Sequence, residues 1–231
     1  MQIHGFNKLT LLDYPGHLAA ILFLGGCNMR CPFCQNASLV INPSSQPTIP
    51  VEEVIAELKK RRGILEGVCI SGGEPTLYAD LPNFIREMKA LDYHVKLDTN
   101  GTNPDMIKAL VNEKLIDYIA MDIKNSREKY ALTTGCSNIN MKAVEDSITF
   151  LLTTQVEYEF RTTIVKELHT DSDILSIGNW LRGAKAYYLQ SFKDSGDIIA
   201  DGLSSPSKET LLHYSELLAP YVEHISLRGI D

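Results

Sequence analysis

The 231-residue sequence has no apolar run near the roughly 20 residues that a membrane-spanning helix needs. The N-terminal stretch MQIHGFNKLTLLDYPG also lacks a basic start followed by an apolar segment, so it is not typical of a signal peptide. We therefore expect a cytoplasmic protein with no membrane partner.

Positive charge is in the minority. Lysine and arginine total 22 and aspartate and glutamate total 29, which gives a formal net charge of −7. A net acidic chain is a poor general binder of nucleic acid. The only dense basic run, LKKRRG at 58–63, closes a predicted helix, where cations interact favourably with the helix dipole. The sequence thus predicts no nucleic-acid partner.

Cysteine is sparse and unevenly placed. The chain has five cysteines, an odd number, and in a reducing cytosol this indicates metal binding or catalysis instead of a disulfide framework. Cys27, Cys31 and Cys34 lie together in GGCNMRCPFCQN at 25–36, whereas Cys69 and Cys136 are isolated. The six histidines show no metal-binding spacing. The 25–36 segment is therefore the candidate metal site.

Short apolar runs alternate with stretches of helical periodicity along the whole chain. Such alternation indicates an α/β fold with a parallel sheet. The length suits about six βα units in an open, partial barrel, since a closed eight-unit barrel usually takes about 250 residues. A doubly wound flat sheet is the alternative. We expect a single domain over 1–231, with the cysteine loop after the first strand. Predicted strands cover 18–24, 67–71, 94–99, 118–123, 157–165 and 186–192, and predicted helices cover 50–63, 81–91, 104–115, 140–154, 172–183 and 207–221.

Polar motifs follow the predicted strands at their carboxyl ends. SGGEPT follows the second strand, LDTNG ends the third, MDIKN ends the fourth and QSF ends the sixth. In parallel α/β folds this edge of the sheet binds ligands. The sequence therefore predicts one site that combines these motifs with the cysteine loop.

Three clustered cysteines are one fewer than a closed metal site needs. Structural zinc takes four ligands, and iron–sulfur clusters of electron carriers are usually held by four cysteines. Cys69 and Cys136 are possible fourth ligands, although Cys69 lies in a predicted strand and is interpreted as a core residue. A four-iron cluster on three thiolates would leave one iron open, as in a catalytic centre. A zinc-binding interaction module and an iron–sulfur electron carrier or redox sensor remain the non-enzymatic alternatives.

The motif CxxxCxxC, with Phe33 just before its last cysteine, resembles the signature of the radical S-adenosylmethionine (radical SAM) superfamily. GGEP at 72–75 is similar to the second motif of that superfamily. The segments LLDYPGHLAAILFLGGCNMRCPFCQN, SGGEPTL, VKLDTNG, YIAMDIK, YEFRTTIV and YYLQSF together resemble the single-cluster activating proteins of glycyl radical enzymes. Among these, they look most like the activating proteins of anaerobic ribonucleoside-triphosphate reductase.

The resemblance implies a function and its cofactors. Cys27, Cys31 and Cys34 would bind a [4Fe–4S] cluster, and SAM would chelate the fourth iron. One electron, from a donor such as flavodoxin or ferredoxin, would cleave SAM. The resulting 5′-deoxyadenosyl radical would take a hydrogen atom from a glycine of a partner glycyl radical enzyme. No catalytic residue beyond the cluster and SAM is implied.

The resemblance also implies which residues contact SAM. Glu74 would hold its amino group, and Asp98, Thr99 and Asp122 would lie near its carboxylate, with a monovalent cation beside them. Lys124 is the alternative partner that neutralises this carboxylate pair directly. The full set implied for SAM is Phe33, Gly72, Gly73, Glu74, Asp98, Thr99, Asp122, Lys124, Arg161 and Gln190.

Two other enzymatic readings remain open within the same superfamily. One is an activase of a pyruvate formate-lyase-type enzyme, because relatives of that type share Asp13, Pro15 and Gly16 upstream of the cysteines. The other is a radical SAM enzyme that acts on a small molecule, such as a pterin-to-deazapurine ring contraction, which would need a walled pocket.

Overall fold

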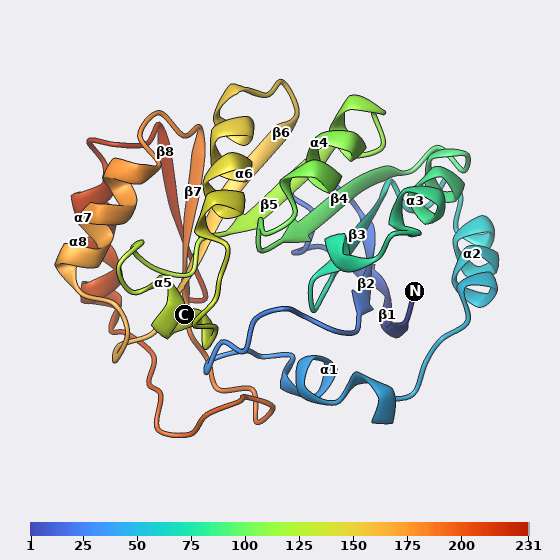
Figure 1. The fold of residues 1–231 in the computed structure, drawn as a ribbon. Coiled ribbons are helices and arrows are strands. Elements are labelled where there is room, and N and C mark those ends of the chain that lie inside the picture. The colour runs from blue at the N-terminus through green and yellow to red at the C-terminus, as the bar shows by residue number, and fades with distance from the viewer. Residues whose placement is uncertain (231) are drawn as a thin grey trace.

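The computed structural model describes residues 1–230, and its centre is one sheet of eight strands in the order β1 to β8. Strands β2 to β8 are parallel, and β1 pairs with β2 in the antiparallel sense. Within the described residues β1 and β8 do not pair with each other, so the sheet is an open, partial barrel (Figure 1). The strands are β1 (Ile3–Thr10), β2 (Ala19–Leu24), β3 (Gly67–Gly72), β4 (His94–Thr99), β5 (Tyr118–Asp122), β6 (Glu157–Ile164), β7 (Ala186–Ser191) and β8 (His224–Arg228).

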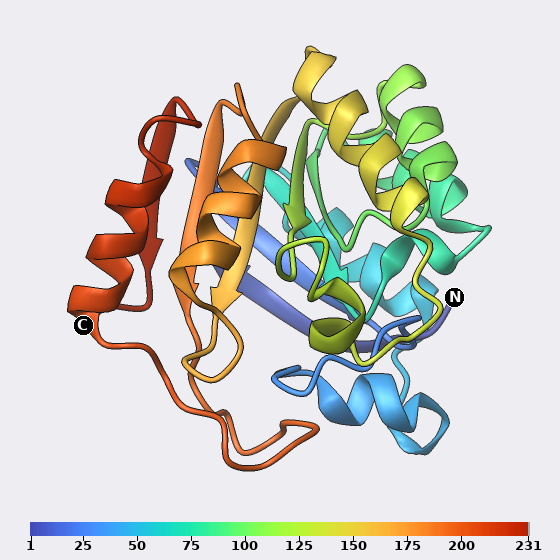
Figure 2. The same ribbon diagram turned by 60° about the vertical axis from the view of Figure 1, so that its left-hand side comes forward.

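The main helices follow the strands and line the outer side of the curved sheet (Figures 1 and 2). They are α2 (Val51–Lys60), α3 (Leu81–Lys89), α4 (Pro104–Asn112), α6 (Met141–Thr153), α7 (Asp171–Trp180) and α8 (Lys208–Leu218). The shorter elements are α1 (Ala37–Ile41), η1 (Pro43–Ser45), η2 (Pro75–Leu77) and α5 (Tyr130–Thr134). This gives about six strand–helix units followed by the terminal strand β8, as expected for a partial barrel.

Local sequence signals explain where these helices begin. The Asn103 side chain accepts a hydrogen bond from the Met106 backbone N–H, and Pro104 occupies the first turn of α4. Thr170 and Asp173 form a capping box at the start of α7. Such caps satisfy backbone donors that have no partner inside the helix.

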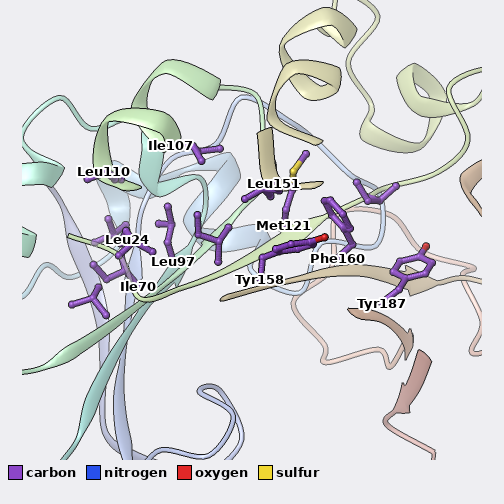
Figure 3. Close-up of a cluster of buried hydrophobic side chains, with 14 of the residues drawn as sticks. Leu24, Ile70, Leu97, Ile107, Leu110, Met121, Leu151, Tyr158, Phe160 and Tyr187 are labelled. Atoms are coloured by element: carbon purple, nitrogen blue, oxygen red, sulfur yellow. The ribbon is translucent and has the colours of Figure 1, made fainter. Parts of the chain in front are cut away.

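The core lies between the sheet and the helices. In Figure 3, Ile107 and Leu110 of α4 lie above Leu97 of β4, and Leu151 of α6 lies beside Met121 of β5. All five side chains are at most 1% exposed. Full burial of each such side chain contributes about 1.5–3 kcal/mol to folding. The helices are therefore held mainly by their apolar faces.

The sequence predicted six of the strands and the main helices, but it missed β1 and β8. The β1 segment, IHGFNKLT, buries only its two terminal residues, so it carries no clear alternation of apolar side chains. The β8 segment, HISLR, is short and has no fully buried residue. Both strands form at the edges of the sheet, where the hydrophobic signal is weakest.

No helix within residues 1–230 is both long enough and apolar enough to cross a lipid bilayer.

Candidate functional site

A cavity of about 200 Å³ lies at the carboxyl ends of the parallel strands. Cys27, Cys31 and Cys34 line one part of it, on the loop that follows β2. The remaining lining comes from the same loop, from α1 and from the ends of β3, β4, β5, β6 and β7: Met29, Phe33, Gln35, Asn36, Val40, Ser71, Gly72, Gly73, Asp98, Thr99, Asn100, Asp122, Lys124, Arg161, Thr163 and Gln190. The expected convergence of the strand-end motifs on one site is confirmed.

The cysteine loop packs directly against the turn that follows β3. The Glu74 backbone N–H donates to Gly26 O at 2.8 Å, and the Asn36 side-chain amide donates to Gly72 O at 3.0 Å. A Cβ on Gly73 would lie 1.9 Å from Gly26 O, and Gly72 has a φ of +114°. A Cβ on Gly72 would lie 2.4 Å from the Leu24 backbone, so only glycine fits at either position. The close approach of Gly73 to Gly26 therefore sets the distance between the two motifs.

The other side of the cysteine loop is held by segments from distant parts of the chain. The Arg30 backbone N–H donates to Thr134 O of α5 at 2.8 Å. The segment between β7 and α8 crosses the loop, where the Ala200 N–H donates to Pro32 O at 2.9 Å. The loop is thus fixed by backbone contacts on several sides, which limits the positions its thiols can reach.

The thiols of Cys27 and Cys31 are largely protonated at neutral pH in this arrangement. Burial raises the pKa of Cys27 to about 11 and that of Cys31 to about 12. Metal binding would have to release these protons, which couples affinity to pH. Across residues 1–230, no three Cys, His, Asp or Glu side chains are close enough to hold a single metal ion. Three soft sulfur donors around a larger space suit an iron–sulfur cluster better than one zinc ion.

The remaining two cysteines lie elsewhere. Cys69 is 0% exposed within β3, and burial raises its pKa well above the ordinary value. Cys136 follows α5 and is partly exposed. Neither thiol lines the cavity. The site therefore offers three cysteines, not four.

Two carboxylates at the ends of β4 and β5 are bridged by a guanidinium from β6. Arg161 Nε donates to Asp122 Oδ1 at 2.8 Å, and its Nη1 donates to Asp98 Oδ2 at 3.3 Å. Lys124 Nζ donates to Asp122 Oδ2 at 2.9 Å. Asp98 Oδ1 is buried without a hydrogen bond in the described chain, and Lys96 Nζ lies 3.5 Å from it. Burial would raise the pKa of Asp122, but Arg161 and Lys124 outweigh it and lower this pKa to about 2.

The charge balance of this cluster favours an anionic ligand. Lys96, Lys124 and Arg161 supply three cationic groups against the two carboxylates of Asp98 and Asp122. The expectation that the two carboxylates approach one another holds, but Arg161 and Lys124 already neutralise them. Charge compensation here does not require a monovalent cation.

The Glu74 side chain lies beside the cavity, buried within the protein. It is 0% exposed and does not line the cavity. Its Oε1 accepts hydrogen bonds from the Thr76 N–H at 3.1 Å, from Thr76 Oγ1 at 2.5 Å and from Thr99 Oγ1 at 2.7 Å. Its Oε2 accepts from the Asn100 N–H at 2.6 Å. The carboxylate is thus engaged by its own chain, and it joins the turn after β3 to the end of β4.

The other residues expected at the site all line the cavity: Phe33, Gly72, Gly73, Asp98, Thr99, Asp122, Lys124, Arg161 and Gln190. The sequence reasoning did not single out Asn100 or Thr163. Asn100 belongs to the LDTNG segment, so its position at a strand end was the available signal. Thr163 lies two residues after Arg161 on β6, and the alternation of a strand places both on the same face.

Comparisons with known proteins identify the family of the chain. A sequence model of the radical SAM superfamily matches residues 21–181. The chain is 31% identical to "Putative glycyl-radical enzyme activating enzyme MJ1227" of Methanocaldococcus jannaschii, over 99% of this chain and 96% of that protein. It is 32% identical to a pyruvate formate-lyase-activating enzyme of Staphylococcus aureus, over 61% of this chain and 60% of that enzyme.

A solved structure of Streptococcus suis SuiB bound to precursor peptide SuiA has a similar fold. Its TM-score is 0.70 at 14% sequence identity, over 90% of this chain and 48% of that chain. Enzymes of the radical SAM superfamily use a [4Fe–4S] cluster and SAM, and the donor set around this cavity suits both groups. The chain therefore belongs to the radical SAM superfamily and, within it, to the glycyl-radical enzyme activating enzymes.

Proposed function

We propose that this enzyme cleaves SAM in the cavity at the carboxyl end of its sheet and removes a hydrogen atom from a glycine of a partner glycyl radical enzyme. The proposal rests on one observation. The three clustered cysteines share a single cavity with every residue expected at SAM except Glu74. That cavity lies at the edge of an open sheet.

Cys27, Cys31 and Cys34 are the proposed ligands of the [4Fe–4S] cluster. When bound, the cluster supplies the electron that cleaves SAM. The chain holds the three thiols through the backbone contacts of the 25–36 loop, and it keeps Cys31 and Phe33 almost free of solvent, at 6% and 5% exposure. Exclusion of water around these groups suppresses side reactions.

The rest of the cavity is the proposed SAM site. Arg161 and Lys124 provide the positive charge for the SAM carboxylate, and Asp98 and Asp122 orient these two cations. Thr99 lines the same part of the cavity. Gly72 and Gly73 allow the backbone to approach the ligand closely. Phe33 and Gln190 are the proposed contacts of the adenine. The proposed role of Glu74 is to support this site through its hydrogen bonds with Thr99 and Asn100.

We further propose which enzyme is the partner. The motif pattern favours an anaerobic ribonucleotide reductase, with an electron donor such as flavodoxin or ferredoxin. The second candidate is a pyruvate formate-lyase-type partner, which the 32% identity to the Staphylococcus aureus activating enzyme favours. Either partner has to place a glycine-bearing loop in the cavity. An open sheet can admit such a loop, whereas a sealed pocket would admit only a small molecule.

The proposal is tested by the rate of SAM cleavage under anaerobic conditions. Without a partner, cleavage should be slow, because no hydrogen donor is held near the reacting carbon. Addition of the correct glycyl radical enzyme should accelerate 5′-deoxyadenosine formation, and a pterin should not. Rapid turnover on a small molecule with no protein partner would overturn the proposal. The two candidate partners are tested side by side.

A further inference from the structure

We propose that Asn100 is a positioning residue for the cluster: its side-chain amide donates an N–H···S hydrogen bond to the Cys27 sulfur and raises the reduction potential of the cluster. The inference rests on the proposed function, since it requires Cys27 to be a cluster ligand.

The geometry begins at the end of β4. Asn100 follows this strand, is 5% exposed and lines the same cavity as the three cysteines. Its Nδ2 lies 3.8 Å from Cys27 Sγ, within the range of hydrogen bonds to sulfur, and 2.9 Å from Asn28 Oδ1. An amide NH2 group has two hydrogens, so both contacts are satisfied at once.

The orientation of the amide is fixed by its other end. Asn100 Oδ1 accepts a hydrogen bond from the Thr102 backbone N–H at 3.0 Å, and a backbone N–H can only donate. The oxygen therefore faces Thr102, and the nitrogen must face Cys27. Two further bonds close a ring, since Thr102 Oγ1 donates to Asn100 Oδ1 at 2.7 Å and accepts from Asn28 Nδ2 at 2.8 Å. Each donor in this ring has one acceptor.

The backbone of Asn100 is also anchored. Its N–H donates to the buried Glu74 Oε2 at 2.6 Å. Glu74 thus connects the glycine turn after β3 to the residue that contacts Cys27. This gives the Glu74 carboxylate a role in positioning the cysteine loop.

The three cysteines differ in the hydrogen bonds their sulfurs receive. Cys27 Sγ accepts from the Asn100 amide and from the Met29 backbone N–H, which lies 3.4 Å away. In the part of the chain that the structure describes, no hydrogen bond reaches the sulfur of Cys31 or Cys34. Donors to a ligating sulfur stabilise the more negative, reduced cluster, and such contacts set the reduction potential. Removal of the Asn100 donor should therefore make the cluster harder to reduce.

The test uses the reconstituted holoenzyme with Asn100→Ala and Asn100→Asp, and Asn103→Ala as the matched control. Asn103 lies three residues further on, caps α4 and donates to Thr76 O, but no hydrogen bond joins it to a cysteine sulfur. Iron content, the midpoint potential of the cluster and the electron paramagnetic resonance spectrum of its reduced form are measured. We expect Asn100→Ala to shift the potential to a more negative value and to alter the spectrum. Asn100→Asp, which puts a carboxylate beside the sulfur, should shift it further.

The control should retain the wild-type potential even if the protein loses stability. An unchanged potential in both Asn100 variants, at full iron content, would overturn the inference while leaving the proposed function intact. An equal shift in the Asn103 control would also overturn it, because the effect would then be structural. If Asn100→Ala does not hold iron, the Asn100→Asp variant decides the question. A shifted midpoint potential in that variant supports the inference, and an unchanged potential overturns it. A wild-type protein that binds no four-iron cluster would overturn the proposed function and this inference together.

Discussion

The guanidinium of Arg161 joins the ends of three neighbouring strands, because its Nε lies 2.8 Å from Asp122 Oδ1 while its Nη1 lies 3.3 Å from Asp98 Oδ2. Arg161 is on β6, Asp122 on β5 and Asp98 on β4. All three side chains line the cavity that contains the cysteines. The Arg161 side chain therefore holds the ends of β4, β5 and β6 together at the proposed SAM site.

Loss of the Asp122 charge should weaken SAM binding without removing the cluster. Asp122→Asn keeps the shape of the side chain but releases Arg161 and Lys124 from their fixed positions. We expect SAM affinity to fall about tenfold, which corresponds to about 1.4 kcal/mol. Equilibrium binding to the iron-loaded protein measures this, with the iron content as the control. Wild-type SAM affinity in the variant would mean that these ion pairs stabilise the fold and do not contribute to SAM binding.

The same carboxylate should contribute to acid sensitivity. The pKa of Asp122 in the folded protein is about 2, below its ordinary value of 3.8. Its stabilisation is therefore complete above pH 3.8 and is lost as the pH falls toward 2. The shift corresponds to at most about 2 kcal/mol, because the side chain keeps some solvent contact.

Denaturant unfolding of the wild type and of Asp122→Asn, from about pH 5 down to about pH 2, checks this linkage. We expect the difference in the free energy of unfolding between the two proteins to shrink as the pH falls. A difference that stays constant over this range would show that Asp122 does not titrate as described.

Gly73 should tolerate no side chain. A Cβ at this position would lie 1.9 Å from Gly26 O, so Gly73→Ala must separate the cysteine loop from the turn after β3. We expect destabilisation of about 3 kcal/mol or more and reduced retention of iron. Gly63→Ala is the control, since it has φ +78° but no atom within 4 Å, and it should cost only about 1 kcal/mol. Equal losses in the two variants, measured by denaturant unfolding and iron analysis, would contradict the packing argument.

Cluster binding should depend on three cysteines and not on five. We expect about four irons per chain in the reconstituted wild type, in Cys69→Ala and in Cys136→Ala. Cys31→Ala should lose most of its iron. Iron and sulfide analysis distinguishes these variants. Loss of the cluster in Cys69→Ala or Cys136→Ala would mean that a fourth thiolate is recruited and that no iron is left open.

Much of this site follows from the sequence because strand ends are simple to locate. Predicted strands such as 18–24 and 94–99 indicate where the strands stop, and parallel strands stop at one edge. The proximity of Asp98 to Asp122 could be predicted in this way, since it follows from their positions at the ends of adjacent strands.

The hydrogen-bond partners of individual side chains could not be predicted from the sequence in the same way. Glu74 is next to two cavity-lining glycines, yet its carboxylate turns into the protein because Thr76, Thr99 and Asn100 supply four donors there. That outcome depends on how the turn after β3 packs against the end of β4, which lies about 25 residues further along the chain. The edge strands β1 and β8 were missed for a related reason, since tertiary pairing stabilises them more than their own sequence does.

The most direct test of the account is the electron paramagnetic resonance spectrum of a candidate partner after anaerobic incubation with the reconstituted protein, SAM and a reductant. We expect a radical signal on the partner, with a hyperfine splitting that changes when the partner's glycines carry 13C or deuterium. The Cys31→Ala variant should give no signal. A signal that the glycine label does not change would contradict this function. Rapid SAM cleavage by the wild type that leaves no radical on any glycyl radical enzyme offered would also contradict it.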